Sequence, residues 1–255
     1  MKKLLVRIFL ALIVLGILGV VAIGLFLDTA VKRGVEAVGP MLTKVDVKLD
    51  SVSLSLLSGN GKLKGLFVGN PSGYKTPSAI QVGTASLALQ PSSIFSPKVV
   101  IRSIQLQAPE ITFETDLKGN NLSKILDNLQ SATGGGGSTG TAADSKAAKK
   151  LQVDDFLISG GKIHLSVTVL GGQSATVPLP EIHLTGLGQG PDGITVAELT
   201  KVVLSAIEKE TAQVAASAVA NLGNDAAGLT KGLGNTATGA VDKVTKGLGD
   251  LFKKK

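Results

Sequence analysis

Side chains that could carry out chemistry are few in this sequence. The 255-residue chain has two histidines, His164 and His183, and no cysteine. Each histidine lies between apolar neighbours, on the polar side of an alternation typical of a β-strand. Without a cysteine or a matching acid cluster they form a poor set of metal ligands, so we expect both to face outward from a sheet. The lack of cysteine excludes disulfides, thiolate metal sites and a cysteine nucleophile.

Other candidate motifs are equally weak. The sequence GGGGSTG at 134–140 lacks the lysine that a phosphate-binding loop requires, so it is better explained as a linker. Asp154 and Asp155 form an isolated acidic pair. Asn121-Leu122-Ser123 fits a glycosylation sequon that is common by chance. We therefore expect no catalytic residue, no metal, no cofactor and no enzymatic activity.

Composition and charge argue against nucleic-acid binding. The chain is 44% hydrophobic but only 3% aromatic, with 32 glycines, which favours turns and extended structure. Its net charge of +7 is spread along the chain: +3 in 1–43, +3 in 44–130, −2 in 131–222 and +3 in 223–255. Nucleic-acid binding would need a clustered basic face, and we expect none.

The region 8–27 is a run of 20 residues without a charge. As a helix it would be about 30 Å long, the thickness of the hydrocarbon core of a bilayer. Lys2, Lys3 and Arg7 precede it, so the positive-inside rule predicts a cytoplasmic N-terminus and a body on the far side. A cleaved signal peptide usually has an apolar region of about 7–15 residues. The longer run favours an uncleaved anchor over cleavage or a buried soluble helix.

Beyond the anchor, the hydrophobic period predicts a strand-rich domain followed by helices. A helix over 28–42 should end near Pro40, and the period then becomes two, with a bulge near Ser51. The expected strands are 44–56, 62–69, 79–90, 98–108, 110–116, 151–159, 162–170, 175–179 and 181–185, with a short helix at 122–129 and a flexible linker at 131–150. We predict three parts: an anchor with a juxtamembrane helix (1–43), one interrupted β-domain (44–194) and a helical tail (195–255). The fold class is therefore mainly β, a curved antiparallel sheet forming a groove, with an N-terminal transmembrane helix and C-terminal amphipathic helices.

The strands are long and aliphatic, which has two explanations. They could form ordinary sheet core buried against helices, or a trough whose apolar face contacts acyl chains. The sequence does not say which face is concave. The candidates for a lipid groove are Val52, Leu54, Leu56, Leu87, Leu89, Ile101, Ile111, Phe113, Ile163, Leu165, Val167 and Val169.

The tail from residue 195 has a helical period and a small apolar face, and it ends in three lysines. The strings LTKGLGN (229–235) and VTKGLGD (244–250) repeat loosely. Such a helix either lies on an anionic membrane surface or packs on the sheet, and the sequence leaves both open. The candidates for membrane-surface contact are Lys246, Lys253, Lys254 and Lys255.

The order of these pieces resembles the N-terminal portion of the AsmA-like family of bacterial envelope proteins. The resemblance rests on the apolar helix followed by VDVKLDSVSLSLLSGNGKLKGLFVGNPSGYKTPSA and VGTASLALQPSSIFSPKVVIRSIQLQAPEITFETDLKGNNLSKILDNL. The return at LQVDDFLISGGKIHLS and VPLPEIHLTGLGQGPDGIT looks like the continuation in short members, and about 60% of the chain is covered. The resemblance implies a curved β-groove projecting from the inner membrane into the periplasm, kinship with bridge-like lipid-transfer proteins such as TamB, and no catalytic residues.

The chain departs from large members of that family in size. A ten-residue strand reaches only about 33 Å, so oligomers or partner proteins would have to extend a path across the periplasm. Our expectation is a single-pass inner-membrane protein with a periplasmic body that handles lipid or maintains the envelope. The expected partners are membrane lipids, phospholipid above all, and a homo-oligomer or other envelope proteins. The alternative is a non-enzymatic scaffold or adaptor without a lipid ligand.

Overall fold

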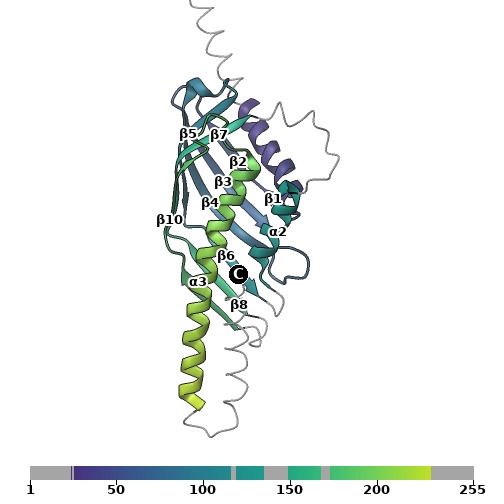
Figure 1. The fold of residues 1–255 in the computed structure, drawn as a ribbon, viewed down its shortest axis with the longest axis vertical. Coiled ribbons are helices and arrows are strands. Elements are labelled where there is room, and N and C mark those ends of the chain that lie inside the picture. The colour runs from purple at the N-terminus through teal and green to yellow at the C-terminus, as the bar shows by residue number, and fades with distance from the viewer. Residues whose placement is uncertain (1–23, 25, 116–118, 135–148, 168–172, 231–255) are drawn as a thin grey trace, which may run out of the picture.

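The computed structural model describes residues 24, 26–115, 119–134, 149–167 and 173–230. All ten strands in these ranges belong to one sheet, which curls into a half-barrel (Figure 1). The helices lie on the concave side of that half-barrel. Mainly β architecture is therefore confirmed. Within the described ranges no helix is both long and apolar enough to cross a bilayer, and the uncharged run at 8–27 lies almost wholly outside them.

The described elements follow the predicted order closely. An N-terminal helix covers 26–43, three residues beyond Pro40. The other helical elements are η1 (Pro91–Ser93), α2 (Asn121–Gly134) and α3 (Val196–Thr230). The strands are β1 (Val47–Lys48), β2 (Ser51–Leu54), β3 (Asn60–Gly69), β4 (Ser78–Leu89), β5 (Lys98–Gln107), β6 (Glu110–Thr115), β7 (Lys150–Ser159), β8 (Lys162–Val167), β9 (Gln173–Pro178) and β10 (Ile182–Leu187).

The bounds of α2 differ from the prediction. The short helix expected at 122–129 is longer, because α2 continues to Gly134 and takes the first four residues of the expected linker. Leu122, Ile125 and Leu129 of α2 are almost fully buried, and this i, i+3, i+7 spacing places them on one face of the helix. Contacts with α3 and β6 hold that face in place.

The sheet is mixed, so the expectation of a purely antiparallel sheet is wrong. The order is β10-β7-β5-β4-β6-β8-β9, with β3 beside β4 and both β1 and β2 beside β3. β5 pairs with β7 in parallel, and so does β6 with β8. A parallel pair needs a long crossover, which here contains α2 and residues 135–148. Local hydrophobic alternation carries no information on that direction.

A line of bends crosses the sheet and gives it its curvature. β5 passes into β6 at Ala108, where φ is +48°, and β7 passes into β8 at Gly160, where φ is +66°. The strands stay bonded through the bend: Ala108 N donates to Ser159 O at 2.8 Å and Lys162 N to Pro109 O at 2.9 Å. Gly161 leaves room for the neighbouring bend, since a Cβ there would lie 2.8 Å from Leu179 Cδ2. Three successive strands thus bend together.

α3 lies across the concave face, as Figure 1 shows. It begins with a capping box: Glu198 N donates to Thr195 Oγ1 at 3.1 Å, and Thr195 N donates to Glu198 Oε2 at 2.8 Å. The Thr195 amide and the Thr195 hydroxyl, which donates to Glu198 Oε2 at 2.7 Å, lower the pKa of Glu198. Farther along, Leu204, Ile207, Thr211 and Ala215 are buried, at the spacing of one helical face. α3 therefore covers part of the sheet with a narrow stripe.

Candidate functional site: the concave face of the sheet

Cross-strand register defines two rows of apolar residues on the concave face. Gly61 reveals the first row, because a Cβ on it would lie 2.4 Å from Leu54 Cδ2 and 2.6 Å from Leu87 Cδ1. These two leucines therefore meet over the glycine on one face. The first row runs Leu54, Gly61, Leu87, Ile104, Phe156 and Leu184 across six strands. The second row runs Val52, Leu63, Ala85, Leu106, Ile158 and Ile182.

The opposite, convex face carries the intervening residues and is polar. One row there is Ser53, Lys62, Ser86, Gln105, Leu157 and His183, and the next is Ser51, Lys64, Thr84, Gln107 and Ser159. Both predicted outward-facing histidines are on this side: His183 Nε2 lies 2.5 Å from Asp155 Oδ1, and His164 Nδ1 lies 3.0 Å from Thr176 Oγ1. Alternation of this kind is typical of a sheet with one covered and one solvated face.

Burial divides the concave face into two zones. Toward β6 and β8, Ile111, Phe113, Ile163 and Leu165 are at most 2% exposed and belong to the hydrophobic core with α2 and α3. Toward the β2–β3 hairpin the same face is only half-buried. The predicted groove residues in or near that second zone are Val52, Leu54, Leu56, Leu87, Leu89 and Ile101. The half-buried residues of this second zone form a surface that we call the open zone. It consists of Val52, Leu54, Leu63, Leu87, Ile101, Ile104, Leu106 and Leu184.

Several predicted site residues lie outside the described part of the chain. They are the Val167 side chain, Val169, Lys246, Lys253, Lys254 and Lys255. Conversely, sequence analysis missed Gly61 and eight apolar members of the two rows: Leu63, Ala85, Ile104, Leu106, Phe156, Ile158, Ile182 and Leu184. Their alternation with Lys62, Lys64, Gln105 and Asp155 was present in the sequence and could have identified them.

α3 covers the concave face with a mixture of large and small apolar side chains. Beside the buried Leu204 and Ile207, its packed residues include Ala206, Ala212 and Ala215. Thr211 is fully buried, and its Oγ1 has no hydrogen-bond partner. Alanines bury little apolar area, and an unpaired buried hydroxyl opposes burial. The turn of α3 around Thr211 is therefore held less firmly than a leucine-rich helix would be.

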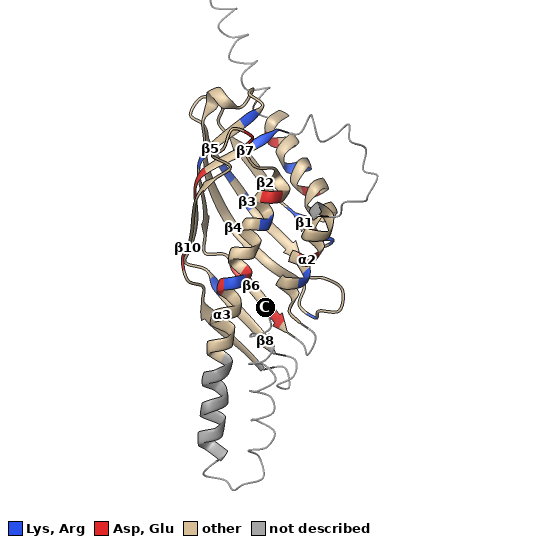
Figure 2. Ribbon diagram, viewed as in Figure 1, with Lys and Arg blue, Asp and Glu red and all other residues tan. Residues whose placement is uncertain are grey.

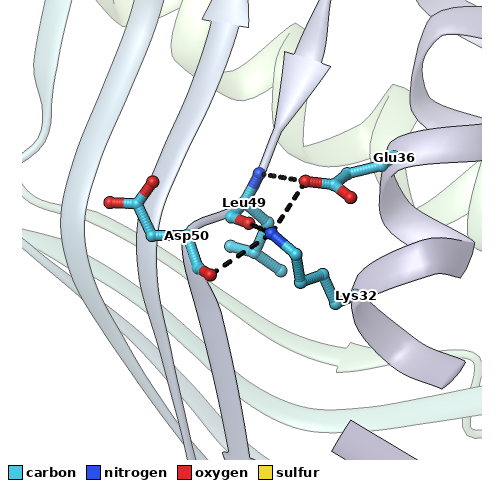
Figure 3. Close-up of polar contacts among 4 residues, drawn as sticks. All are labelled: Lys32, Glu36, Leu49 and Asp50. Atoms are coloured by element: carbon cyan, nitrogen blue, oxygen red, sulfur yellow. Dashed lines mark hydrogen bonds and ion pairs between the residues drawn. The ribbon is translucent and has the colours of Figure 1, made fainter. Parts of the chain in front are cut away.

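Polar side chains of the N-terminal helix hold it against the free edge of β1 and β2. Asp28, Lys32 and Glu36 follow one another at four-residue spacing and so share a helix face. Asp28 Oδ1 accepts from Leu54 N at 2.7 Å, and Glu36 Oε1 accepts from Leu49 N at 3.2 Å. Lys32 Nζ donates to the carbonyls of Leu49 and Asp50 and lies 3.0 Å from Glu36 (Figure 3). We call these three side chains the edge clamp.

The edge clamp should fail in acid. The hydrogen bond from Lys32, the Leu49 amide and the charge of Lys32 lower the pKa of Glu36 below its ordinary value of 4.5. The stability that this carboxylate contributes is therefore complete above pH 4.5 and is lost as the pH falls through the lowered pKa. We expect the hydrogen-exchange protection of the Leu49 amide to fall over that range in the wild type. In Glu36→Ala it should already be low at neutral pH.

A matched control for the clamp is Asp46→Asn. The Asp46 carboxylate is exposed and lies 3.9 Å from Lys48 Nζ, a surface pair of the kind that contributes little to stability. Its removal should leave the protection of Leu49 unchanged. Equal protection of Leu49 in Glu36→Ala and in the wild type would show that the clamp does not hold the edge.

A polar cleft lies apart from the concave rows. Its volume is about 410 Å³, and it is lined by Ser72, Gly73, Tyr74, Gly119, Asn120, Ser123, Lys124 and Asp127. Beneath it, buried Asn121 accepts from Glu114 N at 3.0 Å and donates to Asn70 Oδ1 at 2.7 Å and Thr112 O at 2.8 Å. The Glu114 carboxylate in turn accepts from Lys75 N and Thr76 N at 2.7 and 3.0 Å. This network joins the 70–76 loop to β6 and α2 and so stabilises the fold at this place.

In the part of the chain that the structure describes, no three His, Asp or Glu side chains come together in a group that could hold a metal ion. Lys, Arg, Asp and Glu are interspersed over the helices and the sheet, as Figure 2 shows. The feature with the greatest extent is thus the concave face itself. Comparison with known proteins gave no match to a protein family, to a curated protein or to a solved structure.

Proposed function

We propose that this chain is a membrane-anchored, non-enzymatic protein that handles lipid on the concave face of its sheet. The observation that carries the proposal is the pair of cross-strand rows, which is apolar over six strands and half-buried in the open zone. An acyl chain needs a continuous aliphatic surface shielded from water and little else. The polar convex face offers no such surface.

The proposed setting is the bacterial inner membrane, with the body in the periplasm and phospholipid as the partner. The uncharged 20-residue run and the basic residues before it support this topology. The AsmA-like resemblance supports the lipid. With strands of twelve residues or fewer, the sheet is too short for one chain to bridge the periplasm, so transfer across it would require further copies or other envelope proteins.

Access for a lipid would come from movement of α3. Around Thr211 the helix packs through Ala212, Ala215 and an unpaired hydroxyl, so lifting this part of it exposes less apolar area than lifting a leucine-rich helix would. The open zone already lacks full cover. We therefore place the first lipid contact at Leu54, Leu87 and Ile104, and a deeper contact, after displacement of α3, along the second row.

One observation favours a second candidate, a scaffold or adaptor without a lipid ligand. The zone at Ile111, Phe113 and Ile163 is fully buried against helices, as in an ordinary two-layer core. If α3 never moves, the open zone alone offers a short apolar strip. The chain would then work through its surface and its anchor.

Site-specific photo-crosslinking in native membranes separates these candidates. A photo-reactive amino acid at Ile104 lies on the concave face, and the same residue at the neighbouring Gln105 lies exposed on the convex face. We expect a phospholipid adduct by mass spectrometry at 104 and little or none at 105. Both variants use the full chain, and circular dichroism checks that each one is folded.

A further inference from the structure

The three most exposed large apolar side chains among the described residues are Phe26, Leu57 and Phe95, at 75%, 83% and 82%. They come from three separate segments: the N-terminal helix, the β2–β3 turn and the connection between η1 and β5. Exposed phenylalanines and leucines are unremarkable when scattered singly. Gathered at one end of a molecule they indicate a contact surface.

Hydrogen bonds place all three at the same end of the half-barrel. Leu54 N donates to Asp28 Oδ1 at 2.7 Å, which brings the helix at Phe26 beside the strand that leads to Leu57. Leu89 N donates to Gly59 O at 2.6 Å, which brings the β2–β3 turn beside the segment that leads to Phe95. We call Phe26, Leu57 and Phe95 the rim; it lies at the end where the helix at residue 26 begins (Figure 1).

Lysines flank the rim on the side of Phe95. Lys149 Nζ donates to Ile94 O, Lys150 N donates to Pro97 O at 2.9 Å, and Lys98 Nζ donates to Gly190 O at 3.3 Å. Two acids also lie on this side: Asp192 in the adjoining turn and Glu198 near Lys150. Long basic side chains beside exposed aromatic and leucine residues suit the boundary between headgroups and acyl chains, because the stems stay apolar while the ammonium groups reach water.

We infer that the rim inserts into the surface of the lipid bilayer that holds the anchor, so that the open zone faces the headgroup layer. Phe26 is the penultimate residue of the uncharged run at 8–27, so the proposed anchor makes the bilayer the surface nearest to the rim. The edge clamp then transmits this position to the sheet, since Asp28, Lys32 and Glu36 bond β2 and the residues just before it. The inference rests on the proposed membrane anchor and goes beyond it by assigning Leu57 and Phe95 to the interface.

The chain contains no tryptophan, so the fluorescence of a single introduced tryptophan reports on its own position alone. Full-length Phe26→Trp, Leu57→Trp and Phe95→Trp proteins are reconstituted in phosphatidylcholine–phosphatidylglycerol vesicles with and without brominated acyl chains. Met41→Trp is the matched control: Met41 is 64% exposed on the same helix, about 22 Å beyond residue 26. Side chains buried about 5–10 Å into the interface should lose about half of their emission or more to the bromines.

We expect strong quenching at positions 26, 57 and 95 and none at 41. Quenching at 26 alone would overturn the inference and leave the anchor and the lipid-handling proposal intact. Tryptophan emission at position 95 could instead be blue-shifted, unquenched by bromine and dependent on protein concentration. That result would overturn the inference and indicate that a second copy of the chain covers the rim. No quenching at any position would overturn the anchor as well. Failure of crosslinking at 104, in contrast, would reject lipid on the concave face without affecting the rim.

Discussion

Ile163→Asp is expected to unfold the β-domain. Ile163 is fully buried in the row that joins Ile111 of β6 to Val177 of β9. A carboxylate there would be buried without a partner, at a cost of about 4 kcal/mol or more. That is comparable to the total stability of many domains, about 5–15 kcal/mol. Urea denaturation of the full-length protein in detergent, followed by circular dichroism, measures the loss.

Leu54→Asp is the matched substitution in the open zone. The residue type introduced is the same and the face is the same, but Leu54 is only half-buried, so the new carboxylate can reach water. We expect a loss of about 1–2 kcal/mol, a folded protein, and a weaker phospholipid adduct at position 104. Unfolding by Leu54→Asp to the same extent as by Ile163→Asp would show that the open zone is closed core.

Asn121→Ala should be the most costly change of a polar residue. Asn121 is fully buried and forms three hydrogen bonds, to Glu114 N, Thr112 O and Asn70 Oδ1. Removal of its amide leaves these groups unpaired in the interior, which we expect to lower the free energy of unfolding by about 3 kcal/mol. Thermal and urea unfolding monitored by circular dichroism give the value.

Asn128→Ala controls for the residue type and the helix. Asn128 also belongs to α2, but it is only half-buried, and its Nδ2 makes one hydrogen bond, to Thr43 O at 2.9 Å. Its replacement should cost about 1 kcal/mol. If the two alanine variants were equally stable, the buried network beneath the polar cleft would not hold the 70–76 loop to β6.

The strands and the turns between them were predictable because their signals are local. Val52 and Leu54 alternate with serines, and Ser58-Gly59-Asn60-Gly61 marks a turn, so both the period and its interruption can be read directly. At the bulge expected near Ser51 the structure has a break instead: β1 ends at Lys48 and β2 begins at Ser51, and both keep the same register against β3. The start of the long C-terminal helix was likewise predicted to within one residue.

The features that decide function depend on distant contacts and were not predictable. Ile163 and Leu54 look alike in sequence, yet one is sealed beneath helices and the other is not, because α3 covers only part of the face. The parallel pairing of β5 with β7 depends on the crossover through α2. The edge clamp needs the helix at 28–36 to lie beside residues 49–54, and no local pattern specifies that pairing.

In the proposed function the two zones of the concave face have separate tasks. The zone at Ile111, Phe113 and Ile163 stabilises the fold, as hydrophobic core in any sheet covered by helices. The open zone combines the same chemistry with partial exposure and lies toward the rim. In our account, lipid would enter from the bilayer at the rim and reach Leu54 and Leu87 before it meets α3.

The most direct test of lipid handling is the ratio of phospholipid adducts at positions 104 and 105, measured in full-length protein in native membranes. The two residues are neighbours in β5, and they point to opposite faces of the sheet. Lipid on the concave face predicts an adduct at 104 several times stronger than at 105. Equal adducts, or none at 104 in a folded protein, would contradict the account and leave the scaffold as the better description.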